Sequence, residues 1–205
     1  MSSSWSYLDH AVLPLLVGTS VLDVGCGMGR WGSLIETNYW EAKLPEAPVV
    51  DGIDVFAPNV EHCRRRGTYR RVWRHTLPAA LDARWDTVLA SEVIEHLPAD
   101  EIEATLGVIE GAARRRVILT TPNGPAFRGG HETPTGFNPF EAHISAVDAP
   151  FLRRRGYTVR GVGFGRYDSR LAVMAKRYRV RKSLTFAPWR LPRIAETLVA
   201  YKDVD

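Results

Sequence analysis

An apolar run that ends in a glycine-rich turn constrains the fold more than any other part of the chain. Residues 20–24 have the composition of a buried strand, and Gly25, Gly27 and Gly29 follow it. Glycine has no Cβ, so such a turn between a strand and a helix lets a ligand approach the backbone closely. The alternative is a tight turn that binds nothing, but the number of glycines favours a ligand. The segment therefore predicts a binding site at the end of the first strand.

The rest of the chain alternates short apolar runs with longer stretches of helical period. This alternation is typical of β-α units around a largely parallel sheet. Strands are expected over 20–24, 49–55, 69–73, 86–90, 116–121, 158–164 and 171–177. Helices are expected over 7–17, 31–39, 58–66, 98–113 and 146–155, with Pro58 and Pro98 in first helical turns. The prediction is an α/β fold with a doubly wound, seven-stranded, mostly parallel sheet.

The C-terminal part of the chain predicts a lid and a reversed strand. Residues 122–143 are rich in Gly, Pro, Asn and Phe and are too many for a plain connector, so we expect a lid-like insertion. Only residues 165–170 join the last two expected strands, so these should pair antiparallel at one edge of the sheet. The amphipathic segment 194–201 is expected to be a terminal helix packed on the sheet. A dimer contact is the alternative, and the oligomeric state stays open.

Length and composition fit one domain over residues 1–205. The two cysteines, Cys26 and Cys63, are too few for a disulfide framework, so a reducing compartment and a cytoplasmic location are expected. No run of about 18 apolar residues occurs, which argues against a membrane partner. The net charge is +4, and arginines gather near the ends of expected helices, where cations favour the helix dipole. A nucleic-acid partner is the weaker interpretation of this charge.

Two classes of ligand compete for the glycine turn. Gly27, Gly29 and Gly32 match the GxGxxG fingerprint of dinucleotide-binding proteins. In that fingerprint the first glycine ends the strand, but here Gly25 does so, and counting from Gly25 the third glycine position holds Arg30. This register argues against a nicotinamide or flavin cofactor.

The stretch VLDVGCGMG at 21–29 resembles the first motif of class I S-adenosylmethionine-dependent methyltransferases. Asp54, in GIDV at 52–55, matches the family's acidic residue that accepts hydrogen bonds from both ribose hydroxyls. WDTVLASEVIEHL at 85–97 is similar to the fourth motif, and TTPN at 120–123 to the exit of the fifth strand. The resemblance implies a Rossmann-like methyltransferase fold, S-adenosylmethionine as cofactor and S-adenosylhomocysteine as product. It is strongest to the small-molecule, ubiquinone-biosynthesis-like type.

The resemblance also implies which residues bind the cofactor. Many relatives carry an acidic residue after the third strand that contacts adenine, whereas this chain reads WRHTL at 73–77. Backbone groups near His75 and Thr76 are therefore expected on the adenine side. Asp23 and Glu92 are the candidates nearest to the sulfonium and the amino-acid end. The expected cofactor set is Asp23, Gly25, Cys26, Gly27, Gly29, Asp54, Val55, His75, Thr76, Ser91 and Glu92.

Two histidines are the expected catalytic residues. A hydroxyl acceptor has to lose a proton, and the ordinary pKa of histidine suits a base near neutral pH. His96 follows Glu92 by four residues, and His143 lies in the long segment where relatives commonly bind the acceptor. We therefore expect methyl transfer to a hydroxyl or amine of a small biosynthetic metabolite.

Glu92, Glu95 and His96 form an E-x-x-E-H cluster that leaves a second function open. With His143 they would offer carboxylate and imidazole ligands to Mg²⁺, Mn²⁺ or another divalent ion. This set resembles the metal site of the small-RNA 3′-terminal 2′-O-methyltransferases, which implies an RNA acceptor. The same EVIEHL stretch is common in small-molecule methyltransferases, where no metal is implied, so no metal is assigned. A non-catalytic S-adenosylmethionine-binding module is a third alternative.

Overall fold

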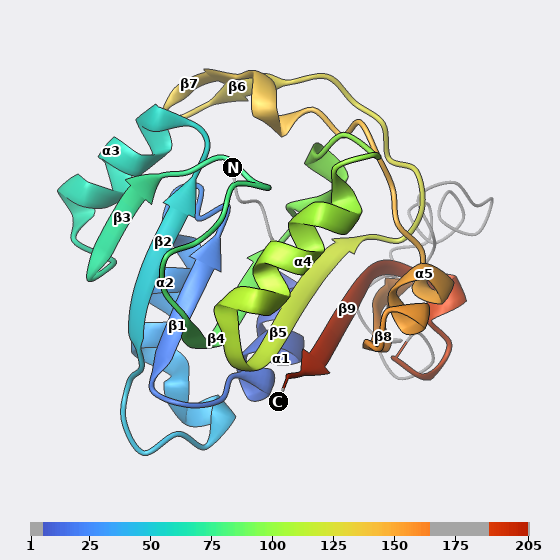
Figure 1. Ribbon diagram of the computed structural model, residues 1–205, viewed down its shortest axis with the longest axis horizontal. Coiled ribbons are helices and arrows are strands. Elements are labelled where there is room, and N and C mark those ends of the chain that lie inside the picture. The colour runs from blue at the N-terminus through green and yellow to red at the C-terminus, as the bar shows by residue number, and fades with distance from the viewer. Residues whose placement is uncertain (1–5, 165–188, 205) are drawn as a thin grey trace.

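The computed structural model describes residues 6–164 and 189–204, with a seven-stranded sheet at its centre (Figure 1). The strands of this sheet are β1 (Ser20–Val24), β2 (Val49–Asp54), β3 (Arg71–Arg74), β4 (Trp85–Ser91), β5 (Ala113–Pro122), β8 (Thr158–Phe164) and β9 (Ala195–Asp203). Their order is β3-β2-β1-β4-β5-β9-β8. Strands β1 to β5 pair in parallel, whereas β9 pairs antiparallel with both β5 and β8. The predicted doubly wound, mostly parallel sheet is confirmed.

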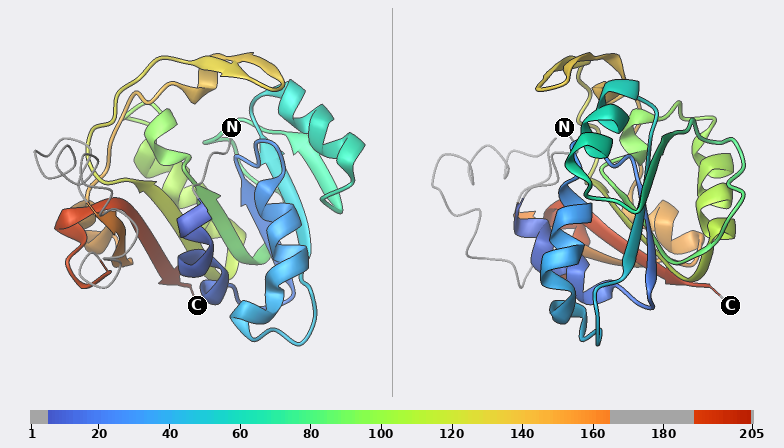
Figure 2. Two further views of the ribbon diagram at one scale, coloured as in Figure 1. Left: turned by 180° about the vertical axis from the view of Figure 1, so that it is seen from behind. Right: turned by 90° about the vertical axis from the view of Figure 1, so that its left-hand side faces the viewer.

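Helices cover both faces of the sheet (Figure 2). They are α1 (Asp9–Val12), α2 (Arg30–Asn38), α3 (Ala57–Arg66), α4 (Ile102–Ala112) and α5 (Ala149–Arg154). Helices α1 and α2 pack on the face to which β1 turns Val21, whereas α4 and α5 pack on the face of Leu22 and Val24. Successive strand residues point to opposite faces, so this apolar run serves both layers of the core. Among the described residues, no helix has the length and apolar character needed to span a bilayer.

The C-terminal segment departs most from expectation, because it is strand β9 and not a terminal helix. Residues 195–200 are all buried, since β9 lies between β5 and β8. A strand covered on both faces shows no clean polar–apolar alternation, which is why its sequence suggested a helix. The edge strand β8 does pair antiparallel with its neighbour β9. The strand expected over 171–177 lies outside the described residues.

Three expected helices are shorter than predicted, and the one expected over 146–155 is α5, which begins only at Ala149. Helix α4 begins at Ile102, and a turn precedes it, so Pro98 does not lie in its first helical turn. The helix expected over 7–17 is divided into α1 and two 3-10 turns, Ser6–Leu8 and Leu13–Leu15. Pro14 lacks the N–H that would continue the α-helix. Pro58, in contrast, lies in the first turn of α3 as predicted.

The segment 122–143 contains a small hairpin, formed by β6 (His131–Thr133) and β7 (Gly136–Asn138), and the 3-10 turn Pro139–Glu141. The hairpin lies beyond the carboxyl ends of β1 and β2, beside α3 (Figure 1). Thr135 Oγ1 donates to Asn59 Oδ1 at 2.8 Å, and the rings of Phe140 and Phe56 lie 6.5 Å apart. These contacts attach the segment to the beginning of α3.

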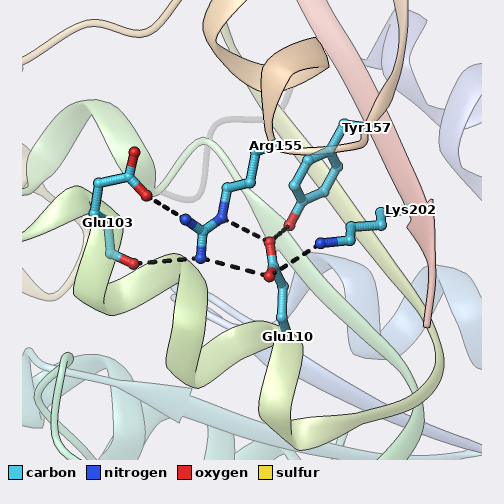
Figure 3. A network of polar contacts seen from close by, with 5 residues as sticks. All are labelled: Glu103, Glu110, Arg155, Tyr157 and Lys202. Carbon is cyan, nitrogen blue, oxygen red and sulfur yellow. Dashed lines mark hydrogen bonds and ion pairs between the residues drawn. The ribbon is translucent and has the colours of Figure 1, made fainter. Parts of the chain in front are cut away.

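A polar network holds α4 against the C-terminal half of the sheet (Figure 3). Arg155 pairs with Glu103 and Glu110 of α4, and its Nε lies 2.8 Å from Glu110 Oε1. Tyr157 Oη donates to the same oxygen at 3.0 Å, and Lys202 Nζ donates to Glu110 Oε2 at 3.2 Å. Because Glu110 accepts from three side chains, it connects α4, the α5–β8 loop and β9.

Candidate active site

The glycine turn after β1 has a backbone conformation that glycine adopts most readily. Gly25, Gly27 and Gly29 have φ angles of 67°, 54° and 83°, all in the left-handed region. Cys26 N donates to Ile53 O at 2.9 Å, which fixes the turn against the end of β2. Because β1 ends at the residue before Gly25, the register expected from the sequence is confirmed. This register separates the turn from the dinucleotide fingerprint.

Two of these glycines make room for protein atoms. A Cβ added at Gly25 would lie 2.7 Å from Val93 Cγ2, and one added at Gly29 would lie 2.9 Å from Thr68 Oγ1. Gly25 and Gly27 line a cavity, whereas Gly29 is not part of its wall. Packing against Thr68 and the left-handed backbone account for the glycine at Gly29, and its expected contact with the cofactor stays a prediction.

A cavity of about 400 Å³ opens at the carboxyl ends of β1, β2 and β4. Open α/β sheets bind ligands at this edge, and the volume lies in the range of small-molecule sites. The segment 122–143 supplies part of the wall, including Phe140 and Ala142. The expected site residues that line the cavity are Gly25, Gly27, Asp54, Val55, His75, Thr76, Glu92 and His96.

The other expected site residues lie behind this wall; they are Asp23, Cys26, Gly29, Ser91 and His143. Asp23 is fully buried and accepts a 2.6 Å hydrogen bond from Tyr69 Oη. The Ser91 and Thr120 hydroxyl oxygens lie 2.8 Å apart, and Cys26 is completely buried. Their expected contact with the cofactor stays a prediction, because in this structure they contact the residues that form the wall and not the cavity itself.

Asp54 presents a fixed carboxylate at the end of β2. Its Oδ2 accepts from Gly27 N at 2.8 Å and from Asn59 Nδ2 at 3.2 Å, and its Oδ1 accepts from Phe56 N at 2.8 Å. Burial raises the pKa of Asp54, while the same three donors oppose that rise. Each carboxylate oxygen can accept more than one hydrogen bond. Oδ1 has only one protein donor, so it can accept a further hydrogen bond from a ligand hydroxyl, and the expected binding of both ribose hydroxyls stays a prediction.

On the side expected for adenine, the wall is formed by the loop after β3. His75 Nε2 lies 3.0 Å from Ala79 O, so its ring is held by its own loop. Thr76 and Leu77 line the cavity beside it. The structure thus brings His75 and Thr76 to the same cavity as Asp54.

Glu92 is held in a backbone conformation that is rare for a residue with a side chain. Its φ is 57°, and its N donates to Thr120 O at 2.9 Å. Its Oε1 accepts from Thr120 Oγ1 at 2.9 Å. Burial raises the pKa of Glu92 to about 7, against the opposing effects of that hydrogen bond and of Arg128. Strained backbone of this kind clusters at functional sites, and Lys43, the other described residue with a side chain in this conformation, lies outside the cavity.

His96 and His143 form an edge-to-face pair, of which His96 lines the cavity. Their ring centroids are 4.7 Å apart and their planes lie at 88°. His96 Nδ1 lies 3.0 Å from Ala142 O, and a carbonyl can only accept, so the neutral ring carries its proton on Nδ1. Burial lowers the pKa of His96, and burial lowers the pKa of His143 to about 3. Both rings are therefore neutral near pH 7, with Nε2 of His96 free to accept a proton.

Three of the four residues expected as an alternative metal set come together. Ligand atoms of Glu95, His96 and His143 all lie within 4.8 Å of one another, whereas Glu92 is not part of this group. Among the described residues, Glu95 Oε1 and His143 Nδ1 are buried without a hydrogen-bond partner. Burial and the neighbouring Glu92 raise the pKa of Glu95 well above its ordinary value. The donor set fits a divalent cation in type, although a neutral Glu95 carboxyl also accounts for the unpaired oxygen.

The structure places two residues at or beside the site, Asn59 and Tyr69, to which the sequence did not point. Asn59 lines the cavity and bonds both Asp54 and Thr135. Its position five residues after Asp54, in the first turn of the following helix, was the only available signal. Phe140 was expected only as part of the lid, and Tyr69 only as part of a strand.

The strand order, the glycine turn after β1 and the carboxylate that ends β2 together define a Rossmann-like methyltransferase. A cavity of this size with Asp54 on its wall fits S-adenosylmethionine. The family model for a methyltransferase domain matches residues 6–201. The chain therefore belongs to this family and is an enzyme that uses S-adenosylmethionine. The non-catalytic alternative is not retained.

Several solved structures share this fold. An S-adenosylmethionine-dependent methyltransferase from Archaeoglobus fulgidus is 18% identical, with a TM-score of 0.60 over 96% of this chain and 91% of that one. Magnesium protoporphyrin IX methyltransferase from Synechocystis PCC 6803, with bound S-adenosylhomocysteine, is 18% identical, with a TM-score of 0.54 over 95% and 77%. A methyltransferase from Mesorhizobium loti is 13% identical, with a TM-score of 0.58 over 100% of both chains. No curated protein matches the chain significantly.

Proposed function

We propose that the protein transfers a methyl group from S-adenosylmethionine to a hydroxyl or amine of a small-molecule acceptor. In this proposal it is a methyltransferase of the ubiquinone-biosynthesis-like type. The observation that carries this proposal is the shared cavity. Asp54 and the glycine turn line the same space as His96 and the residues of the segment 122–143. A donor held by the first group would therefore lie next to an acceptor held by the second.

The residues of the cavity divide into those that hold each part of the cofactor. Asp54 would accept from the ribose hydroxyls, and the loop at His75 and Thr76 would contact adenine. The backbone at Gly25 and Gly27 and the Glu92 carboxyl would hold the amino-acid end. S-adenosylmethionine supplies a methyl group that its sulfonium already activates. The remaining tasks of the chain are to orient the acceptor and to exclude water, and orientation can supply about 7–11 kcal/mol of a barrier.

We assign the general base to His96. Its Nε2 would take the proton from an acceptor hydroxyl, while the Ala142 carbonyl keeps the ring oriented through Nδ1. The Glu95 carboxyl lies beside this ring, with Oε1 3.9 Å from His96 Nε2. His143 was the other candidate from the sequence, but it does not line the cavity. We propose that it supports the His96 ring.

The segment 122–143 would act as a lid over the acceptor. Phe127, Phe137 and Phe140 are large apolar side chains of this segment that remain exposed, with 66%, 56% and 46% of their surface accessible. Apolar side chains above a cavity can cover an acceptor and displace water from it. The contact of Thr135 with Asn59 supports a closed position next to the cofactor site.

Two measurements test the proposed function. Calorimetry should detect binding of S-adenosylmethionine and S-adenosylhomocysteine, and a mass-spectrometric screen of hydroxyl and amine metabolites should find an acceptor that gains one methyl group. No heat with either compound would overturn the donor site. Binding without methylation of any hydroxyl or amine would overturn the acceptor class.

A second candidate function is metal-assisted methylation of a molecule with two neighbouring hydroxyls, such as the 3′-terminal ribose of an RNA. The convergence of Glu95, His96 and His143, with two buried unpaired ligand atoms, favours this candidate. A cation bound there would use His96 as a ligand, so His96 could not also be the base. The two candidates therefore make opposite predictions about the need for a divalent ion.

Removal of divalent ions separates them. With His96 as the base, we expect EDTA to leave the methylation rate unchanged, and Mg²⁺, Mn²⁺ or Zn²⁺ to leave the midpoint of thermal unfolding unchanged. A bound cation would instead raise that midpoint, because it binds the folded state. The metal mechanism would replace the base mechanism if EDTA abolished activity and one added ion restored it. In that case the same ion should not restore activity to the Glu95→Gln variant.

A further inference from the structure

Tyr69 lies in the loop between α3 and β3, and its ring occupies a slot formed by glycines. A Cβ added at Gly32 would lie 2.8 Å from the ring, and one added at Gly52 would lie 3.2 Å from it. Gly29, which ends the glycine turn, borders the same slot, with an added Cβ 3.5 Å from the ring. Real Cβ atoms do not make contacts as short as 2.8 Å, so a side chain at position 32 would collide with the ring. The glycines in α2 and β2 therefore leave space for a tyrosine.

The Tyr69 hydroxyl connects the end of β1 to the beginning of α2. It donates to Asp23 Oδ2 at 2.6 Å and accepts weakly from Gly32 N at 3.4 Å. Asp23 is fully buried two residues before Gly25, and its Oδ1 has no hydrogen-bond partner among the described residues. One phenol therefore fixes the carboxylate that lies directly under the glycine turn.

The groups around Asp23 make its charge depend on this hydrogen bond. Burial raises the pKa of Asp23 to about 7, the Tyr69 hydrogen bond opposes the rise, and the charge of Asp54 adds to it. The Cys26 and Cys63 thiols are the other titratable groups of this cluster. Burial also raises the pKa of Tyr69, so the phenol keeps its proton and remains a donor. Without that donor, the Asp23 carboxyl would favour the neutral form.

We propose that Tyr69 is a positioning residue for the cofactor, because its hydroxyl keeps the Asp23 carboxylate and the glycine turn in the arrangement that binds the positively charged end of S-adenosylmethionine. The proposal rests on the glycine turn being the donor site, as proposed above, and is independent of the acceptor. Tyr69 itself does not line the cavity, so it acts through Asp23.

Tyr69→Phe tests this role, because it keeps the ring in its slot and removes only the hydroxyl. We expect the dissociation constant of S-adenosylmethionine at neutral pH to rise about tenfold, as for loss of a hydrogen bond to a charged group. An ionised Asp23 favours the cationic ligand, so affinity falls as the pH drops through the Asp23 pKa. In the variant this fall should begin at higher pH, because the pKa of Asp23 is raised further.

The dissociation constants are measured by calorimetry, and two further variants make this test specific for Tyr69 and Asp23. Tyr157→Phe removes a phenol that donates to Glu110 in the network of Figure 3, so it should lower stability without changing the pH profile of binding. Asp23→Asn removes the titrating group, and in that background Tyr69→Phe should cause no further change in the profile. The cycle distinguishes Asp23 from Glu92, which also titrates near neutrality and lines the cavity.

The proposal is wrong if Tyr69→Phe binds like Tyr157→Phe, with an unchanged dissociation constant and pH profile. If Tyr69→Phe does not fold, as thermal unfolding would reveal, Asp23→Asn decides, and wild-type affinity above neutral pH would overturn the role. Asp54→Asn separates this failure from a wrong donor site. Loss of binding in Asp54→Asn with no effect of Tyr69→Phe would reject only the role of Tyr69.

Discussion

Replacing Asp54 by asparagine should weaken the binding of S-adenosylhomocysteine by about a hundredfold or more. Three donors already fix the Asp54 carboxylate, including Gly27 N of the glycine turn. An amide keeps the shape of the side chain but carries no charge, and its NH₂ group would face one of these donors. A hydrogen bond to a charged acceptor contributes about 1.5–3 kcal/mol, and the misplaced NH₂ group adds to the loss. Isothermal titration calorimetry measures the loss directly.

Asp51→Asn is the matched control for this experiment. Asp51 is also a buried aspartate of β2, but it lies three residues earlier in the strand and accepts from Arg70, Arg71 and Trp85. Its replacement should lower the free energy of unfolding and leave the dissociation constant within about twofold of the wild-type value. An Asp54→Asn protein that binds as well as Asp51→Asn would show that Asp54 does not hold the cofactor.

Replacing His96 by glutamine should lower the methylation rate of a hydroxyl acceptor by about 10²- to 10⁴-fold, the range that general-base catalysis contributes. Glutamine fills similar space and can still donate to the Ala142 carbonyl, but it cannot accept a proton at neutral pH. S-adenosylhomocysteine should bind the variant normally, because the ribose and adenine groups of the site are unchanged. Single-turnover mass spectrometry with saturating cofactor measures the chemical step.

His10→Gln provides the control, since His10 is far more exposed, with 84% of its side chain accessible, and does not line the cavity. It should methylate at the wild-type rate. A rate for His96→Gln within about threefold of wild type would show that another group takes the proton from the acceptor. A parallel loss of cofactor affinity would instead indicate that the cavity had collapsed.

The residues proposed to hold the donor could be grouped from the sequence because their signals are local. Gly25 follows an apolar run directly, and Asp54 ends the next one. The carboxyl ends of adjacent parallel strands meet at one edge of a sheet, so strand order alone brings these residues together. No such rule brings together the residues proposed to bind the acceptor. His143 and His96 lie in different loops, and only the packing of the two rings shows which of them faces the cavity.

The sequence by itself determined the doubly wound sheet, the glycine turn and the carboxylate at the end of β2, because each depends on short-range periodicity and on residues close in the chain. Tertiary structure alone decided that 195–203 is a strand inside the sheet, since burial on both faces removes the alternation that identifies a strand. It also showed why positions 29 and 32 hold glycine. Tyr69, 46 residues from Asp23 in the chain, fills the space beside them, and no local pattern records a contact at that separation.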